Sequence, residues 1–178
     1  AQPSHLHVIN FRQARKEHIL SHEYEFLTEA IIPDYLRTQE STRTRIDADR
    51  IASIREIGDG NLNLVFHIVD EAGRGIILKQ SLPYVRMTGE GWPMTPERVA
   101  REAGSLKTYH ELTPDLVVEP FAYDPERYIL VLEDLSDHSV WRDALNRSET
   151  HRDVAARLGE YVAAVAVDTS ILGAVRTA

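Results

Sequence analysis

Two features that lie close together in the sequence have residue types suited to binding phosphate groups. Gly58 and Gly60 flank Asp59 just before a strand-like segment, and Lys79 lies late in the strand-like segment that follows it. Glycine allows a positive φ and lets backbone N–H groups approach an anion that a Cβ would hold off. Kinases combine such a turn with a strand lysine to cover and grip nucleotide phosphates. On pattern alone, an ordinary hairpin turn is the alternative, because it is the commoner origin of Gly-x-Gly.

The segments around the glycines and the lysine have the patterns of β-strands. Residues 62–69 alternate with a period of two, residues 71–75 supply a glycine-containing turn, and residues 76–79 form the returning strand. Further strands are expected over residues 51–57, 117–123 and 128–133. Together with a helix between the third and fourth strands, these segments predict an α+β lobe with a five-stranded antiparallel sheet and an inserted helix.

The inserted helix is expected to begin at Thr95, which is followed by Pro96 and Glu97. This order places a capping residue first, then a proline in the first turn and an acid at the positive end of the helix. Glu102 lies on this helix. In kinase-like folds a glutamate on this helix pairs with the strand lysine and holds it toward the phosphates. A merely solvated glutamate is the alternative on pattern alone.

Composition and charge exclude several classes of protein. The chain has 178 residues, of which 43% are hydrophobic, and a net charge of -8. No basic stripe is present, so nucleic acid is not expected as a partner. The absence of cysteine excludes disulfides and thiolate metal sites. There is no apolar run near the roughly 18 residues of a membrane span and no signal-peptide pattern, so we expect a cytoplasmic protein without membrane association.

Two histidines near the N-terminus invite a metal-binding interpretation. His18 and His22 are four residues apart and could share one face of a helix. No third ligand accompanies them, and the H-E-x-x-H arrangement is absent. We therefore expect no metal site in this chain.

Five short motifs resemble one family of kinases. They are GDGNLNLVF at 58–66, LKQSLPYVR at 78–86, GEGWPMT at 89–95, LEDLSDH at 132–138 and WR at 141–142. In this order and spacing the chain resembles the N-terminal lobe of 5-methylthioribose kinases, in the aminoglycoside-phosphotransferase branch of the protein-kinase-like superfamily. The resemblance covers roughly residues 55 to 145.

The resemblance implies roles for individual residues. Lys79 would grip the α and β phosphates of the nucleotide, and Glu102 would orient Lys79. The residues implied in nucleotide binding are Gly58, Asp59, Gly60, Asn61, Asn63, Lys79, Glu133 and Leu135. Adenine would be held by main-chain groups between Glu133 and Leu135. Trp92 would lie in a loop over residues 85–95, either as a lid over the substrate or as a plug of the lobe.

The resemblance also implies an activity. This is the ATP-dependent phosphorylation of 5-methylthioribose at its anomeric hydroxyl, a step of methionine salvage, with Mg²⁺ as cofactor and a homodimer as the assembly. The His-Gly-Asp catalytic loop of the family is absent from the sequence. We therefore expect an N-terminal nucleotide-binding half whose metal ligands lie elsewhere and which is inactive by itself.

The expected organisation has three parts. They are a leader and helix over residues 1–50, the nucleotide-binding lobe over 51–136 and the first helix of a second lobe within 137–178. Two alternatives stay open: another small-molecule kinase of the same branch, acting on an amino alcohol or aminoglycoside, and a nucleotide-binding module without catalysis.

Overall fold

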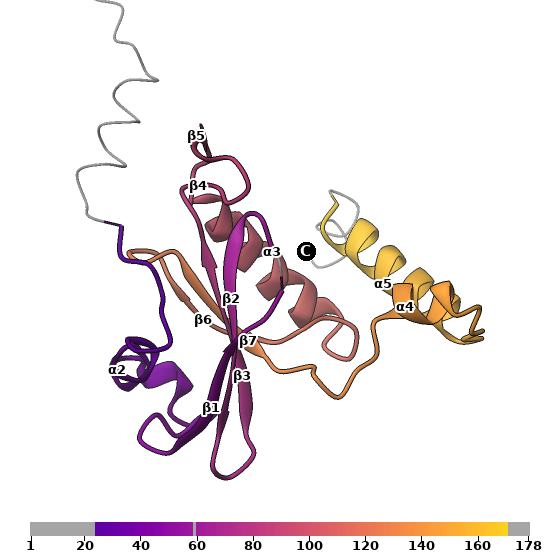
Figure 1. The fold of residues 1–178 in the computed structure, drawn as a ribbon. Coiled ribbons are helices and arrows are strands. Elements are labelled where there is room, and N and C mark those ends of the chain that lie inside the picture. The colour runs from indigo at the N-terminus through magenta and orange to yellow at the C-terminus, as the bar shows by residue number, and fades with distance from the viewer. Residues whose placement is uncertain (1–23, 59, 171–178) are drawn as a thin grey trace, which may run out of the picture.

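The computed structural model describes residues 24–58 and 60–170 of the chain (Figure 1). The predictions made for His18, His22 and Asp59 concern residues outside these ranges. No helix in the described part of the chain is long and apolar enough to cross a membrane.

The centre of the molecule is a five-stranded antiparallel sheet with the strand order β1-β2-β3-β7-β6. Its strands are β1 (Ile51–Glu56), β2 (Asn63–Asp70), β3 (Gly75–Ser81), β6 (Pro120–Asp124) and β7 (Ile129–Glu133). A separate two-stranded hairpin consists of β4 (Tyr84–Val85) and β5 (Gly89–Pro93). The predicted α+β class and the five-stranded antiparallel sheet are confirmed.

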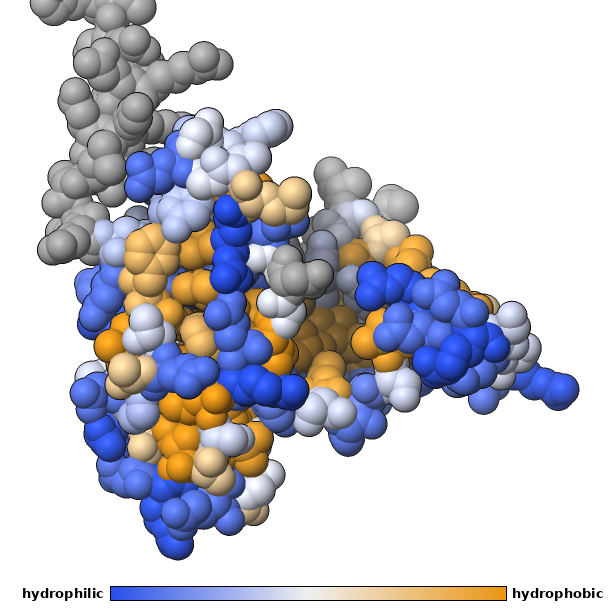
Figure 2. Space-filling view, in the orientation of Figure 1, coloured by the Kyte–Doolittle hydropathy of each residue, from blue (hydrophilic) through white to orange (hydrophobic). Residues whose placement is uncertain are grey.

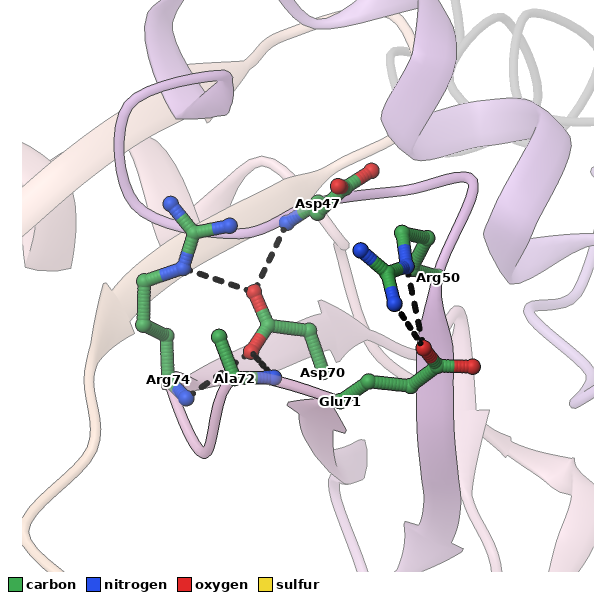
Figure 3. Close-up of a pocket in the computed structure, with 6 residues that line it drawn as sticks. All are labelled: Asp47, Arg50, Asp70, Glu71, Ala72 and Arg74. Carbon is green, nitrogen blue, oxygen red and sulfur yellow. Dashed lines mark hydrogen bonds and ion pairs between the residues drawn. The ribbon is translucent and has the colours of Figure 1, made fainter.

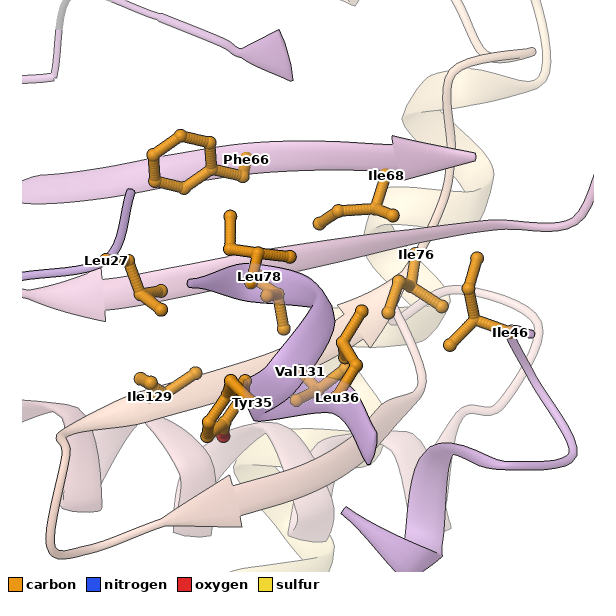
Figure 4. Close-up of a cluster of buried hydrophobic side chains, with 11 residues drawn as sticks. Leu27, Tyr35, Leu36, Ile46, Phe66, Ile68, Ile76, Leu78, Ile129 and Val131 are labelled. Atoms are coloured by element: carbon orange, nitrogen blue, oxygen red, sulfur yellow. The ribbon is translucent and has the colours of Figure 1, made fainter. Parts of the chain in front are cut away.

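One face of the sheet is sealed by the N-terminal part of the chain. Here lie α2 (Ile32–Thr38) and the short 3-10 helix η1 (Glu40–Thr42). Side chains of α2, of the flanking residues Leu27 and Ile46 and of the sheet form one buried cluster (Figure 4). It comprises Leu27, Ile32, Tyr35, Leu36, Ile46, Phe66, Ile68, Ile76, Leu78, Ile129 and Val131. Because successive strand residues point to opposite faces, the alternate residues of β2, β3 and β7 turn away from this core.

A buried glutamine fixes the N-terminal segment to the sheet. The Gln80 amide group donates to the carbonyls of Glu25 and Arg127 over 2.9 and 3.1 Å, and its oxygen accepts the N–H of Leu27 over 2.8 Å. The side chain is 1% exposed, and these contacts use both of its donors and its acceptor. A buried amide is therefore satisfied by two segments, residues 25–27 and Arg127, that are distant from it in sequence.

Helix α3 (Arg98–Leu112) lies on the opposite face of the sheet from α2 (Figure 1). Val99 and Ala103 pack there against Leu130 of β7. The prediction that Thr95 caps this helix is wrong, because the cap position is Glu97 and no side chain bonds to the first turn. A residue before proline is biased away from helical angles, so regular hydrogen bonding begins only after Pro96.

Two further helices form an arm beside α3. They are α4 (Trp141–Asn146) and α5 (Val154–Asp168), both within the range 137–178 in which the first helix of a second lobe was expected. No residue of α5 is buried, and its aromatic contact with α3 joins Tyr161 to Tyr109 at 6.2 Å between ring centroids. In Figure 2, hydrophobic surface lines the recess between the sheet and this arm.

A hollow at the β2–β3 turn is organised by one buried carboxylate (Figure 3). The side chain of Asp70 accepts backbone N–H groups of Asp47, Ala72 and Arg74 and the Nε–H of Arg74, all within 3.1 Å. Burial alone would raise the pKa of this carboxyl, but the hydrogen bonds from Arg74 and Asp47 outweigh it and lower the pKa. Asp70 thus accepts the hydrogen bonds that hold this turn together. The hollow lies at the end of β2 away from Gly58 and Gly60.

Candidate functional site

Lys79 and Glu102 meet on the face of the sheet that α3 covers. The Nζ of Lys79 donates to Oε1 of Glu102 in an ion pair. The side chains are 22% and 36% exposed, respectively, so both remain accessible to a ligand. A lysine held by a carboxylate on a neighbouring helix is oriented but not enclosed. Such an ammonium can direct its remaining protons to a phosphate oxygen.

Strand register explains why the lysine points toward the helix. Lys79 of β3 pairs with Val65 of β2 on one side and with Leu130 of β7 on the other. Leu130 belongs to the cluster that α3 covers, and paired residues point to the same face of a sheet. Lys79 therefore lies on the α3 face, and Glu102 lies next to the helix residue Ala103 that anchors α3 in this cluster.

The glycine turn joins β1 to β2 at the lysine end of the sheet. Gly58 has a φ of +84°, a conformation that residues with a Cβ rarely adopt. The carbonyl of Asn61 accepts the N–H of Arg86 over 2.7 Å, which ties the turn to the segment after β3. Asn63 follows as the first residue of β2 and pairs with Ser81, two residues from Lys79. Gly60 is exposed in the same turn.

Arg98 connects the glycine turn to α3, and the sequence analysis missed it. Its guanidinium donates to the carbonyls of Leu62, Thr95 and Leu82 and to Oδ1 of Asn63, the last at 3.3 Å. The Asn63 side chain, predicted to face the nucleotide, is therefore engaged with Arg98. Burial lowers the pKa of Arg98 below its usual value. Glu102 follows Arg98 by four residues, which is about one turn of α3. The two side chains therefore lie on the same side of the helix.

The exit of β7 lies farther along the sheet from Lys79. Ile76 pairs with Glu133, three residues before Lys79, which is about 10 Å along a strand. The N–H of Glu133 donates to the carbonyl of Glu119, and the Glu133 carboxylate accepts the N–H of Glu119, both over 3.0 Å. The amide of Glu133 is thus already used by the sheet. Of the predicted main-chain contacts, the Glu133 carbonyl and the amide of the exposed Leu135 fit an adenine-binding role.

Trp92 lies on the β4–β5 hairpin and is 62% exposed. This exposure excludes the interpretation of Trp92 as a plug of the lobe. The alternative role, a lid over the substrate, stays a prediction.

The described ranges, 24–58 and 60–170, hold no group of three or more His, Cys, Asp or Glu side chains that could bind a metal ion.

Comparison with known proteins gives one consistent family. No protein-family model matches the chain. The methylthioribose kinase of Pectobacterium atrosepticum is 49% identical over 121 residues, which cover 67% of this chain and 30% of the relative. The resemblance to methylthioribose kinases is confirmed. The methylthioribose kinases of Yersinia pseudotuberculosis and Citrobacter koseri are 45% and 43% identical over 125 residues, 70% of this chain and 31% of each relative.

The chain thus spans about 30% of the length of the methylthioribose kinases that it matches. The roles of Lys79, Glu102, Trp92 and the glycine turn stay predictions that rest on the geometry described above.

Proposed function

We propose that residues 51–136 form the nucleotide-binding lobe of a protein-kinase-like, ATP-dependent methylthioribose kinase and that residues 137–178 begin its second lobe. The observation that carries the proposal is the ion pair between Lys79 and Glu102, two residues 23 positions apart on different elements. Similarity to proteins named methylthioribose kinase supports the substrate.

In this proposal the residues of the chain bind and orient the nucleotide. Lys79 contacts the α and β phosphates. Glu102 holds the Lys79 ammonium on the α3 face of the sheet. The turn at Gly58, Gly60 and Asn61 covers the phosphates with backbone N–H groups, since glycine permits their close approach. The Glu133 carbonyl and the Leu135 amide hold adenine.

The reaction is transfer of the γ-phosphoryl group of ATP to the anomeric hydroxyl of 5-methylthioribose. Mg²⁺ supplies charge neutralisation at the phosphates when bound. The described residues do not provide its ligands, so we assign the metal ligands and the catalytic base to residues outside those described. What this chain contributes is positioning of the nucleotide and electrostatic stabilisation by Lys79.

Titration calorimetry of the chain with ATP tests the nucleotide-binding role. Loss of one charge-assisted hydrogen bond costs about 1.5–3 kcal/mol, so Lys79→Ala should weaken ATP binding by about 10- to 150-fold. Lys107→Ala is the matched control, because Lys107 is an exposed lysine on the same helix as Glu102 and its replacement removes the same charge. Equal affinity of the Lys79→Ala variant and the parent chain would contradict the assignment.

ADP release separates the kinase from the two alternatives. In the gene product that carries residues 1–178, we expect release with methylthioribose and not with ribose or choline. Release with choline would indicate a different small-molecule kinase. ATP binding that depends on Lys79, without release for any acceptor, would indicate a nucleotide-binding module.

Assembly as a homodimer in the cytoplasm completes the proposal by family resemblance. Light scattering of the same gene product measures its mass directly. A monomer at micromolar concentration would contradict this part without affecting the nucleotide site.

A further inference from the structure

A hydrogen bond on the α3 face of the sheet links two strands that are not neighbours. The Nε2 of His67, in β2, lies 2.8 Å from Oδ2 of Asp134, the residue after β7. Strand β3 lies between β2 and β7 in the sheet. Only 14% and 16% of the two side chains is exposed. The contact therefore crosses over the middle strand in a largely enclosed position.

Gly75 makes this crossing sterically feasible. It begins β3, where the next residue, Ile76, pairs with Glu133. A Cβ on Gly75 would lie 2.2 Å from Oδ2 of Asp134, far inside van der Waals contact. The left-handed conformation of the β2–β3 turn belongs to Gly73, with a φ of +80°, and Gly75 has no such angle. A side chain at position 75 would therefore displace the Asp134 carboxylate from its present position.

The Asp134 carboxylate is also fixed from its other side. Its Oδ1 accepts the N–H of Ser136 over 2.9 Å, and its Oδ2 accepts the Ser136 hydroxyl over 3.0 Å. Burial alone would raise the pKa of Asp134, but the hydrogen bonds from His67 and Ser136 outweigh it and lower the pKa. The carboxylate is therefore an ionised acceptor that holds the chain as it leaves β7.

We propose that His67, Gly75 and Asp134 form a clip that fixes residues 133–135 and thereby positions the nucleotide base. The inference deepens the proposed function and rests on it, because the clip matters for the ligand only if the base contacts residues 133–135. The three residues are positioning residues, since their side chains hold one another and the main chain. Lys79 and Glu102, farther along the sheet, hold the phosphates independently.

The clip predicts different responses to ligands with and without a base. The probes are ATP and inorganic tripolyphosphate, titrated into the 178-residue chain by calorimetry. His67→Leu removes the donor, and we expect about tenfold weaker ATP binding with tripolyphosphate affinity unchanged within about twofold. His67→Gln retains an N–H donor at similar reach and should bind ATP nearly as the parent does.

Gly75→Ala tests the clip from the middle strand. The added methyl group should displace Asp134 and reproduce the loss seen in His67→Leu. Gly104→Ala is the control, because a Cβ there meets nothing within 4 Å. Equal weakening of ATP and tripolyphosphate, or unchanged ATP binding in His67→Leu, would overturn the proposal. If Gly75→Ala fails to fold, the comparison of His67→Leu with His67→Gln decides.

Hydrogen exchange of the unliganded chain tests the clip without any nucleotide. In His67→Leu the amides of residues 134–136 should exchange faster, while those in the middle of β2 and β3 stay protected. Unchanged exchange at 134–136 would overturn the clip. If the parent chain binds neither probe, the proposed function fails and the nucleotide role of the clip fails with it, whereas exchange still decides whether the clip holds the β7 exit.

Discussion

The two faces of the central sheet are made by the same strands but have opposite surroundings. On the face toward α2, Leu78 and Val131 are completely buried in one apolar cluster. On the face toward α3, Leu130 is also fully buried, whereas Lys79 and Leu132 are only partly buried. The boundary between a sealed face and an open face thus runs between adjacent residues of a single strand.

Because successive strand residues point to opposite faces, neighbouring residues of one strand are expected to serve different ends, one folding stability and the next ligand binding. Side chains on the sealed face contribute through the apolar area they remove from water. At the Lys79–Glu102 pair on the other face the polar groups stay accessible, and an ion pair at such exposure contributes little to stability. We therefore expect substitutions on one face to change unfolding and those on the other to change ligand affinity.

The largest expected effect is on the sealed face. Leu78→Ala removes a fully buried side chain from the cluster, and the free energy of unfolding should fall by about 2–5 kcal/mol. Urea denaturation followed by circular dichroism measures this change. Leu158→Ala in α5, where the side chain is 47% exposed, is the control and should shift the free energy by about 0.5 kcal/mol or less. Similar losses for the two variants would mean that the faces do not differ as described.

The next effect concerns the only glutamine among the described residues that is fully buried. Gln80→Leu keeps the volume but leaves the carbonyls of Glu25 and Arg127 without their donor. The free energy of unfolding should fall by about 1–3 kcal/mol, the cost of unpaired buried polar groups. Gln39→Leu is the control, since its amide makes one long contact of 3.4 Å. A Gln80→Leu chain as stable as the parent would show that the N-terminal segment is not held by this amide.

A pH-dependent effect is expected at the β2–β3 turn. The pKa of Asp70 is lower in the folded chain than in the unfolded chain. Its stabilising contribution is therefore present above the unfolded value of about 3.9 and is lost as the pH falls through the lower folded value. Asp70→Asn cannot ionise, so its urea midpoint should fall less than that of the parent between about pH 6 and pH 3. The exposed Asp115 provides the control, and Asp115→Asn should keep the acid sensitivity of the parent.

The smallest effect on stability is expected on the open face. Glu102→Gln removes the charge that orients Lys79, at a side chain that is 36% exposed. The free energy of unfolding should change by less than about 1 kcal/mol. ATP affinity, measured by calorimetry, should nevertheless fall by about three- to tenfold, because the lysine loses its fixed direction. A large loss of stability with unchanged affinity would reverse the assignment of the two faces.

The sheet could be predicted from sequence because its information is local. Alternation over residues 62–69 and the glycines of the following turn fix strands and hairpin without knowledge of distant contacts. The hairpin of β4 and β5 was expected only as a loop, since its strands are short and rich in glycine. The start of α3 was placed too early because the capping signal of Thr95 competes with the restriction imposed by Pro96.

The site could be predicted only in part, for the same reason. The pairing of Lys79 with Glu102 could be expected from the resemblance to kinases, whereas Arg98 reaches carbonyls as much as 36 residues away. The clip between His67 and Asp134 spans 67 residues and depends on strand order, which no local pattern reports. Single polar residues whose partners are set by topology give no signal in one sequence.

The buried amide of Gln80 also has a consequence for the order in which the chain can fold during synthesis. Residues 25–27 leave the ribosome early, yet their hydrogen-bond partner emerges more than 50 residues later. The second N–H of the Gln80 amide finds its acceptor, the carbonyl of Arg127, only when Arg127 has been added. Residues 25–27 are thus fixed only after much later parts of the chain have been made, and nascent chains halted before residue 127 should expose Glu25–Leu27 to protease. Most of the sheet must be translated before residues 25–27 can be held in place by Gln80.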